Sequence, residues 1–140
     1  MAYEEMVFKT GDIILVDFSN GIGHQQKGIR PALIVSNNIG NTFSPVLEVL
    51  PITTKRTNSK MPTHVNIEPT AENGLRAYST IEAEGKIPVN KFQVKKHLGK
   101  ISDPDLERVA FAMVYATPII LQAFNNGVQD TENFKKVSKI

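Results

Sequence analysis

The side chain best suited to chemistry in this sequence is an arginine at the end of a segment rich in hydrogen-bond donors. Arg30 closes the stretch GIGHQQKGIR at positions 21–30 and is followed by Pro31. A guanidinium keeps its proton in proteins, its planar fork matches two phosphate oxygens, and the proline after it favours an extended backbone. The sequence therefore predicts a charged fork at the entrance of a strand. The alternative is a surface arginine that balances Glu48 or a C-terminal carbonyl.

Two threonines are the second candidate for phosphate chemistry. Thr53 and Thr54 end an apolar stretch, directly before Lys55 and Arg56. Hydroxyl groups at a strand end can contact a phosphate, and the basic pair would attract one. The alternative is that β-branched threonine simply suits a strand.

The donor-rich segment holds further side chains that could take part. His24 could carry protons near neutral pH, and Gln25 and Gln26 could read base edges or position a substrate. Each of these three could equally be a solvated loop side chain. Three phenylalanines could stack on unpaired bases, although burial in the core is the expectation for each: Phe18, Phe43 and Phe92.

Other kinds of catalysis find no support in the sequence. His24, His64 and His97 show none of the local spacings that bring two metal ligands onto one face, so neither a metal nor another cofactor is expected. The chain has no cysteine, which excludes disulfides and cysteine-based metal sites. The motifs GxxxxGK[ST], GxGxxG and GxSxG are absent as well.

Length and composition indicate one ordinary globular domain. The chain has 140 residues, with an apolar share of 41% and a charged share of 21%. Its start lacks the features of a secretory signal, and no stretch approaches the ~20 apolar residues that span a bilayer, so we expect a soluble, cytoplasmic protein. The net charge is only +2, but residues 19–63 carry five basic residues against one acid. An anion-binding face is therefore expected in this region.

The first two thirds of the chain are predicted to be β-structure. Short apolar or alternating stretches predict strands near 11–18, 32–37, 45–53, 64–67 and 78–83, a spacing typical of a small barrel or sandwich. The stretch SNNIGNTFSP at 36–45 is predicted to be a connection, because Asn and Gly suit tight or left-handed backbone. Gly85 and Pro88 are expected to bend or end the last strand.

The last third is predicted to be helical. Ser102 or Asp103 can cap a helix. One apolar face is expected to pack on the core, and its members recur at three- and four-residue steps: Leu106, Val109, Ala110, Met113 and Val114. Pro118 interrupts the pattern, so Thr117 is expected to cap a second short helix or to mark a kink. We expect one domain over residues 1–127 and a flexible tail over 128–140.

In combination, these segments resemble the MazF/PemK family of toxins from type II toxin–antitoxin systems. The matching stretches are GDIILVD at 11–17, GHQQKGIRP at 23–31, ALIVSN at 32–37, IGNTFSP at 39–45, VLPITT at 49–54 and PTHVNI at 62–67. Weaker similarity continues through EGKIPVNK at 84–91 to the last helix. The resemblance covers roughly residues 9–122, and the order and spacing of the motifs make it specific.

The resemblance implies a mainly β fold with a C-terminal helix, a small SH3-like barrel of the CcdB/MazF type. It also implies a homodimer without a cofactor that cleaves single-stranded RNA at short sequence motifs, is inhibited by a cognate antitoxin, and binds DNA together with that antitoxin. The family's catalytic arginine falls on Arg30 and its catalytic threonine on Thr53. Where the family has an arginine near the EGKIP stretch, Lys86 or Arg76 is the candidate substitute.

A mechanism follows as a hypothesis. RNA carries its own nucleophile, the ribose 2′-OH, so cleavage to a 2′,3′-cyclic phosphate and a 5′-OH needs positioning, proton transfer and charge stabilisation. Arg30 would bind the scissile phosphate and Thr53 would orient an oxygen, with His24 or Gln25 assisting. The remaining candidates to bind RNA are in the two loops and at strand ends: Ser19, Asn20, Ile22, Gln26, Lys27, Asn37, Thr54, Lys55 and Arg56.

Two other kinds of protein stay open as alternatives. The same barrel could be a non-catalytic nucleic-acid-binding module or a CcdB-like gyrase inhibitor. A gyrase inhibitor of that kind depends on a C-terminal aromatic segment, whereas this chain lacks Trp and ends KVSKI. A soluble barrel whose loops bind another protein is the third reading, and it gives no role to Arg30 and Thr53.

Overall fold

A computed structural model of the chain describes residues 5–19, 28–54 and 60–126. Seven antiparallel strands form its sheet, in the order β4-β5-β3-β2-β1-β7, with β6 paired to β3. The strands are β1 (Asp12–Asp17), β2 (Ile29–Ile34), β3 (Val46–Thr53), β4 (His64–Ile67), β5 (Ser79–Glu82), β6 (Ile87–Asn90) and β7 (Val94–Lys100). The helices are α1 (Asn38–Phe43), α2 (Asp103–Ala116) and α3 (Pro118–Asn125), and the short 3₁₀ turns are η2 (Ala83–Gly85) and η3 (Lys91–Gln93).

Five of the strands curve around a small barrel core. The neighbours run β6, β3, β2, β1 and β7, and η3 joins β6 to β7 along the chain. Alternate residues of these strands point into the barrel, where they bury one apolar cluster: Phe8, Ile14, Val16, Phe18, Ala32, Ile34, Leu47, Val49, Val89 and Val94. The small β-barrel predicted from the sequence is confirmed.

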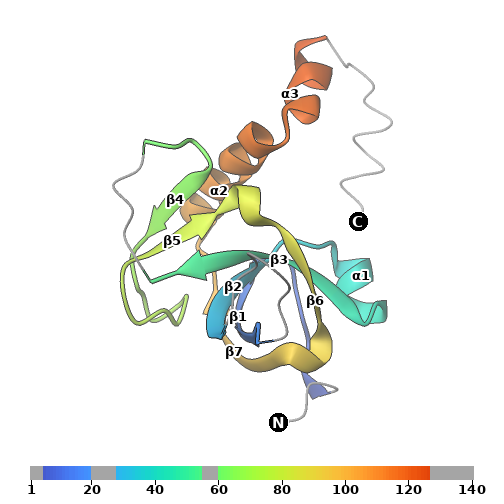
Figure 1. Cartoon of the computed structure of the whole chain (residues 1–140), viewed down its shortest axis with the longest axis vertical. Coiled ribbons are helices and arrows are strands. Elements are labelled where there is room, and N and C mark those ends of the chain that lie inside the picture. Colours follow the sequence, from blue (N-terminus) through green and yellow to red (C-terminus); the bar gives the residue numbers. More distant parts are fainter. Residues whose placement is uncertain (1–4, 20–27, 55–59, 127–140) are drawn as a thin grey trace.

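The other face of the sheet packs on a second core, which α2 covers. The intervening residues of the same strands, such as Ile13, Leu33 and Leu50, join residues of β4 and β5 in this cluster. β3 belongs to both cores because it pairs with β6 near its start, with β2 in its middle and with β5 at its end. Figure 1 shows the result: α1 lies at the start of β3, while β4 and β5 lie at its end, on the side of α2 and α3.

The predicted apolar face of α2 needs correction. Val109 and Ala112 are buried and Met113 packs against them, but Leu106 is 43% exposed and Ala110 is also exposed. The buried stripe is narrow because α2 packs mainly against η2 and β4, which are three and four residues long. The break predicted at Pro118 is confirmed, since α2 and α3 meet there at 90°.

The connection predicted at 36–45 is wrong, because most of it forms helix α1. Asn37 caps this helix by accepting a hydrogen bond from the Gly40 N–H at 2.8 Å. Asn41 is buried, and its amide donates to the Ser36 carbonyl at 2.8 Å. In the described part of the chain only glycines take positive φ, namely Gly11, Gly28 and Gly74, so these asparagines act as hydrogen-bonding groups and not as left-handed turn residues.

Strands β6 and β7 lie in a region for which the sequence predicted no strand. β6 contains Pro88 and follows Gly85, and β7 reads VKKHLGK, which lacks a sustained apolar pattern. Both strands tolerate this composition because β7 is an edge strand and β6 pairs only with β3. Of the three phenylalanines expected in the core, Phe18 is buried, whereas Phe43 and Phe92 are 82% and 60% exposed.

The helical end of the chain leaves a large apolar surface exposed. Its side chains are on α2 and α3: Leu106, Phe111, Tyr115, Ile119, Ile120, Leu121 and Phe124. Among the described helices no single one is long and apolar enough to cross a membrane, although α2 and α3 taken together meet the length and composition required.

Candidate active site

The structure describes five of the thirteen residues that the sequence nominated for the site. They are Ser19, Arg30, Asn37, Thr53 and Thr54. The other eight lie outside the described residues: Asn20, Ile22, His24, Gln25, Gln26, Lys27, Lys55 and Arg56. The geometry of the site is therefore built from the strand ends.

Arg30 and Thr53 lie at the adjoining ends of two neighbouring strands. β2 and β3 pair as Ile34–Val49, Leu33–Leu50 and Ala32–Pro51, and the same count places Arg30 opposite Thr53. The ladder itself stops at Ala32–Pro51, because the proline has no N–H to donate and β3 then turns to pair with β5.

Strand alternation sets both side chains on one side of the sheet. Arg30 is two residues from Ala32 and Thr53 is four residues from Val49, and both Ala32 and Val49 point into the barrel. Because residues two and four apart on a strand share a face, Arg30 and Thr53 lie on the barrel side as well. Each of the two residues is half-buried. Register and alternation therefore place a guanidinium fork and a hydroxyl group at adjoining strand ends on the barrel side of the sheet, here called the barrel mouth. Groups of these two kinds commonly bind phosphate.

Glu48, the acidic partner considered for Arg30 in the sequence analysis, lies far from it along the sheet. The backbone N–H of Val35 donates to the Glu48 carbonyl at 2.9 Å, so Glu48 lies five residues along β2 from Arg30, or roughly 16 Å at 3.3 Å per residue. The Glu48 carboxylate instead pairs with Lys86 at 3.2 Å. Arg30 is thus not a surface residue that balances Glu48, and Lys86 is engaged away from the mouth.

Two further polar residues, Thr80 and Asn66, lie next to Thr53 across the sheet and form a polar row with it. Neither of them was nominated from the sequence. Thr53 pairs with Thr80 on β5, and Thr80 pairs with Asn66 on β4. Thr80 is fully buried, and its hydroxyl donates to the Asn66 side-chain oxygen at 2.8 Å. The alternation of HVNI at 64–67 was a signal for Asn66, but nothing in the sequence indicates that Thr80 is buried.

A histidine–glutamate pair lies beside this row. His64 shares the strand face of Asn66, and its Nε2 is 2.7 Å from Oε1 of Glu84 on η2. Partial burial acts to raise the pKa of Glu84, but hydrogen bonds from its own backbone N–H and from His64 outweigh burial and leave that pKa below its ordinary value. Glu84 is therefore a carboxylate near neutral pH.

The remaining described candidates have different surroundings. Ser19 follows β1, and its N–H and hydroxyl both donate to the Asp17 carboxylate, which lowers the pKa of Asp17. Asn37 caps α1 beyond the far end of β2, so the structure does not bring it to Arg30 and Thr53. Thr54 is exposed and lies on the opposite face of the sheet from Thr53.

Within residues 5–19, 28–54 and 60–126, no three His, Asp or Glu side chains gather in a way that could hold a metal ion.

The basic stretch at 19–63 is not the only one in the sequence, because residues 91–100 contain four lysines and no acid. Three of those lysines, Lys95, Lys96 and Lys100, are exposed on β7.

The fold and this site define a class of protein: a small β-barrel with an arginine and a threonine at adjoining strand ends on its inner face. Comparison with known proteins gives the family. A family model described as "PemK-like, MazF-like toxin of type II toxin-antitoxin system" matches residues 9–114. The chain belongs to this family.

Individual relatives agree with the assignment. Endoribonuclease EndoA of Bacillus subtilis is 32% identical over 115 residues, which are 82% of this chain and 98% of that protein. Endoribonuclease MazF of Staphylococcus saprophyticus is 36% identical over 103 residues, 74% of this chain and 85% of that protein. Among solved structures, an endoribonuclease in complex with its cognate antitoxin from Mycobacterial species has a TM-score of 0.62 at 25% identity, covering 78% of this chain and 93% of that one.

Proposed function

We propose that this chain cleaves single-stranded RNA at short sequence motifs, without a metal ion, and that Arg30 and Thr53 carry the reaction. The broader activity rests on its relatives: the chain is a MazF-type endoribonuclease toxin. The observation that supports the finer proposal is the placement of Arg30 and Thr53 at adjoining strand ends, on one side of the sheet.

The proposed chemistry starts from the substrate. The ribose 2′-OH attacks the adjacent phosphorus, the bond to the 5′-oxygen of the next nucleotide breaks, and the products are a 2′,3′-cyclic phosphate and a 5′-OH. The attacking hydroxyl loses a proton and the leaving oxygen gains one, so the atoms balance without water or a metal in this step. The protein must align the attack and stabilise extra charge on phosphorus.

Arg30 and Thr53 would divide this work. The Arg30 fork donates two hydrogen bonds to the non-bridging phosphate oxygens and opposes the charge that develops on them. Because a guanidinium does not release its proton in proteins, Arg30 is not the general acid. Thr53 orients a phosphate oxygen or the 2′-OH, while His24 and Gln25 are proposed for proton transfer. Thr80 and Asn66 hold the strand face beside Thr53.

RNA binding is proposed to extend from the barrel mouth to residues 20–27 and 55–59, which the sequence predicts to be loops. Unpaired bases can be splayed out and read on their hydrogen-bonding edges, and the basic residues of these loops would hold the backbone. The candidates remain those nominated from the sequence, with Asn37 set apart because it lies beyond the far end of β2.

Two protein partners belong to the proposal. An endoribonuclease of similar fold is known in complex with its cognate antitoxin, which supports an antitoxin as the inhibitor of this chain in the cytoplasm. A second copy of the chain is the other partner, and the exposed apolar side chains of α2 and α3 would be covered by such a contact. Light scattering on the purified chain measures this directly, and a monomer at micromolar concentration contradicts the homodimer.

The test of the activity uses single-stranded RNA in excess EDTA. We expect discrete cuts with 2′,3′-cyclic phosphate and 5′-OH ends, and sequencing of the ends from a random RNA pool gives the cleavage motif. Cuts that require a divalent metal contradict the proposed chemistry. A gel shift without cuts, or inhibition of DNA gyrase, would favour the non-catalytic module instead.

A further inference from the structure

The ends of β2 and β3 that carry Arg30 and Thr53 also line a cavity on the opposite face of the sheet. Pro31 and Thr54 each follow one of those residues, and strand alternation turns them to the reverse side. They border a space of about 250 Å³ together with residues of β1, β7 and the 74–79 segment: Leu15, Gly74, Leu75, Arg76, Ala77, Ser79, Lys96 and Leu98. The cavity is therefore separate from the barrel mouth, although it shares the same two strand ends.

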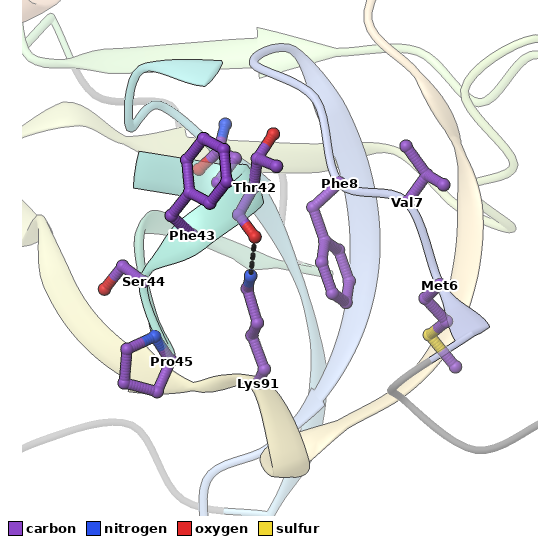
Figure 2. Close-up of a pocket in the computed structure, with 9 residues that line it drawn as sticks. Met6, Val7, Phe8, Thr42, Phe43, Ser44, Pro45 and Lys91 are labelled. Atoms are coloured by element: carbon purple, nitrogen blue, oxygen red, sulfur yellow. Dashed lines mark hydrogen bonds between the residues drawn. The ribbon is translucent and has the colours of Figure 1, made fainter. Parts of the chain in front are cut away.

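The cavity carries two positive charges and no carboxylate. Arg76 and Lys96 line it, and neither makes a hydrogen bond or an ion pair with any part of the chain that the structure describes. Lys91, which lines another cavity, does have partners within the chain. Between residues 6–8 and α1, Lys91 Nζ lies 3.5 Å from the Thr42 carbonyl oxygen and 5.6 Å from the centre of the Phe8 ring (Figure 2). Arg76 and Lys96 lack comparable contacts, so an anion is the group that complements them.

The loop that presents Arg76 is built rigidly. Asn73 is buried, and its side chain accepts from the N–H groups of Thr70 and Leu75 at 2.9 and 3.0 Å and donates to the Glu68 carbonyl at 2.8 Å. The bonds to Thr70 and Glu68 fix the backbone before Asn73, and the bond to Leu75 fixes the backbone after it. The loop is thus held by hydrogen bonds that are shielded from water.

Two close backbone contacts fix the same loop against β7. A Cβ on Gly74 would overlap the Leu98 carbonyl oxygen, and a Cβ on Gly99 would overlap that of Glu72. The Lys100 N–H also donates to the Glu72 carbonyl at 2.9 Å. Arg76 on the loop and Lys96 on the strand are therefore held in a fixed relation, as a preorganised binding site requires.

We propose that this cavity binds one nucleotide of the substrate RNA, flanking the scissile phosphate, with the phosphate between Arg76 and Lys96. The apolar wall of Leu15, Pro31 and Leu98 would cover the sugar or base, and the Thr54 hydroxyl would contact the backbone. A volume of about 250 Å³ is just below the ~300 Å³ at which ligand pockets begin, so the cavity has room for no more than one nucleotide. This inference rests on the proposed function.

The path of the RNA follows from the shared strand ends. A strand that crosses Arg30 and Thr53 at the barrel mouth needs only to bend around the ends of β2 and β3 to reach Pro31 and Thr54. Single-stranded RNA is flexible enough for such a bend, and an arginine and a lysine on the far side would neutralise its backbone. The cavity would thereby set how much RNA beside the cleavage point the protein engages.

The first test measures binding in a Thr53→Val background, in which the RNA stays uncut. Lys96→Gln is compared with Lys95→Gln, because the two lysines are neighbours on β7 and both are exposed, but only Lys96 lines the cavity. We expect Lys96→Gln to lower the slope of log affinity against log salt by about 0.7, the value for one phosphate contact of a single strand. Lys95→Gln should leave the slope unchanged. Equal slopes for the two variants overturn the proposal.

The second test uses cleavage of an RNA series shortened from either end. For long substrates, Lys96→Gln and Arg76→Gln should lower kcat/KM several-fold, to the level of short substrates that cannot reach the cavity. For the short substrates, variants and wild type should cut equally. A loss that is independent of length overturns the inference even if Arg30 remains essential. A loss of antitoxin affinity with unchanged RNA binding also overturns it and assigns the cavity to the protein partner.

The two proposals can fail separately. If the wild-type chain cuts no RNA, the proposed activity fails, while the salt slope of binding still reports on the cavity. If the chain cuts RNA and Lys96 behaves as Lys95 does, the cavity proposal fails and the activity stands.

Discussion

The two faces of the strand ends at β2 and β3 are built in opposite ways. At the barrel mouth, Arg30 and Thr53 lie in register with a polar row that continues through Thr80 to Asn66, where the Thr80 hydroxyl donates to the Asn66 side chain. On the reverse face, a cavity with an apolar wall is lined by two exposed cations that have no partner among the described residues. A polar, well-connected site is suited to aligning reacting atoms, whereas an apolar cavity with unpaired charge is suited to holding a ligand. In the two proposals above, one pair of strand ends carries chemistry on one face and binding on the other.

The largest expected effect comes from the mouth. Arg30→Ala should lower the cleavage rate by about 10³-fold, because it removes the donors that oppose charge on the phosphate. Arg30→Lys should restore only a small part of the rate, since an ammonium cannot form the two-pronged contact. Cleavage of a fluorogenic RNA measures both variants. Arg108→Ala on α2 is the control, and an Arg30→Ala protein as fast as this control contradicts the assignment.

The second prediction disturbs the reverse face. Gly74→Ala should destabilise the chain by more than about 2 kcal/mol, because the new methyl group meets the Leu98 backbone at a φ of +70°. Gly28→Ala is the matched control: its φ is +81°, but no described residue lies within 4 Å of the added group, so we expect a cost of only about 1 kcal/mol. Urea unfolding measures both. Equal costs would show that the loop is not pressed against β7.

The third prediction separates hydroxyl from methyl in the polar row. Thr80→Val keeps the shape but removes the donor to Asn66, which should cost about 1–3 kcal/mol of stability and lower cleavage roughly tenfold. Thr80→Ser keeps the donor and should cut RNA at nearly the wild-type rate despite the lost methyl group. Cleavage rates at a temperature where all three proteins are folded make the comparison. If Thr80→Ser loses as much activity as Thr80→Val, the hydroxyl has no positioning role.

The smallest expected effect is a pH dependence of stability. The pKa of Glu84 is lower in the folded chain than its ordinary value of 4.5, so Glu84 contributes stability that is complete above pH 4.5 and is lost as the pH falls further. Glu84→Gln should therefore flatten the acid side of the stability curve by less than about 1 kcal/mol, since the carboxylate is partly exposed. Unfolding free energies between pH 3 and pH 7 measure this change. An unchanged acid side would mean that Glu84 is not held by His64 and the backbone.

The mouth was more accessible to sequence reasoning than the reverse face. Arg30 comes just before one apolar stretch that predicts a strand and Thr53 ends another, and their pairing as a site came from the resemblance to the MazF/PemK family. Asn66 was visible as the polar partner in an alternating strand. Thr80 could not be predicted, because its burial depends on which strands lie beside β5.

Other sequence predictions failed for the same reason: the outcome depends on tertiary neighbours that local patterns do not show. The β7 stretch VKKHLGK was not predicted as a strand, because an edge strand needs only a few apolar residues to join the sheet. The 36–45 segment looks like a turn by composition, yet the cap by Asn37 and the buried Asn41 make it helical. The cavity at Arg76 and Lys96 joins residues twenty positions apart, so local patterns carried no signal for it.

Strand β3 also determines how the molecule can open. Because it pairs with β6, β2 and β5 in turn, its middle cannot separate from one partner strand without loosening its pairing with the next. The backbone amides of Val49, Leu50 and Ile52 should therefore exchange with deuterium only through global unfolding, while those of β4 at the sheet edge exchange through smaller openings. Thr53 is the last residue of the strand that opens least.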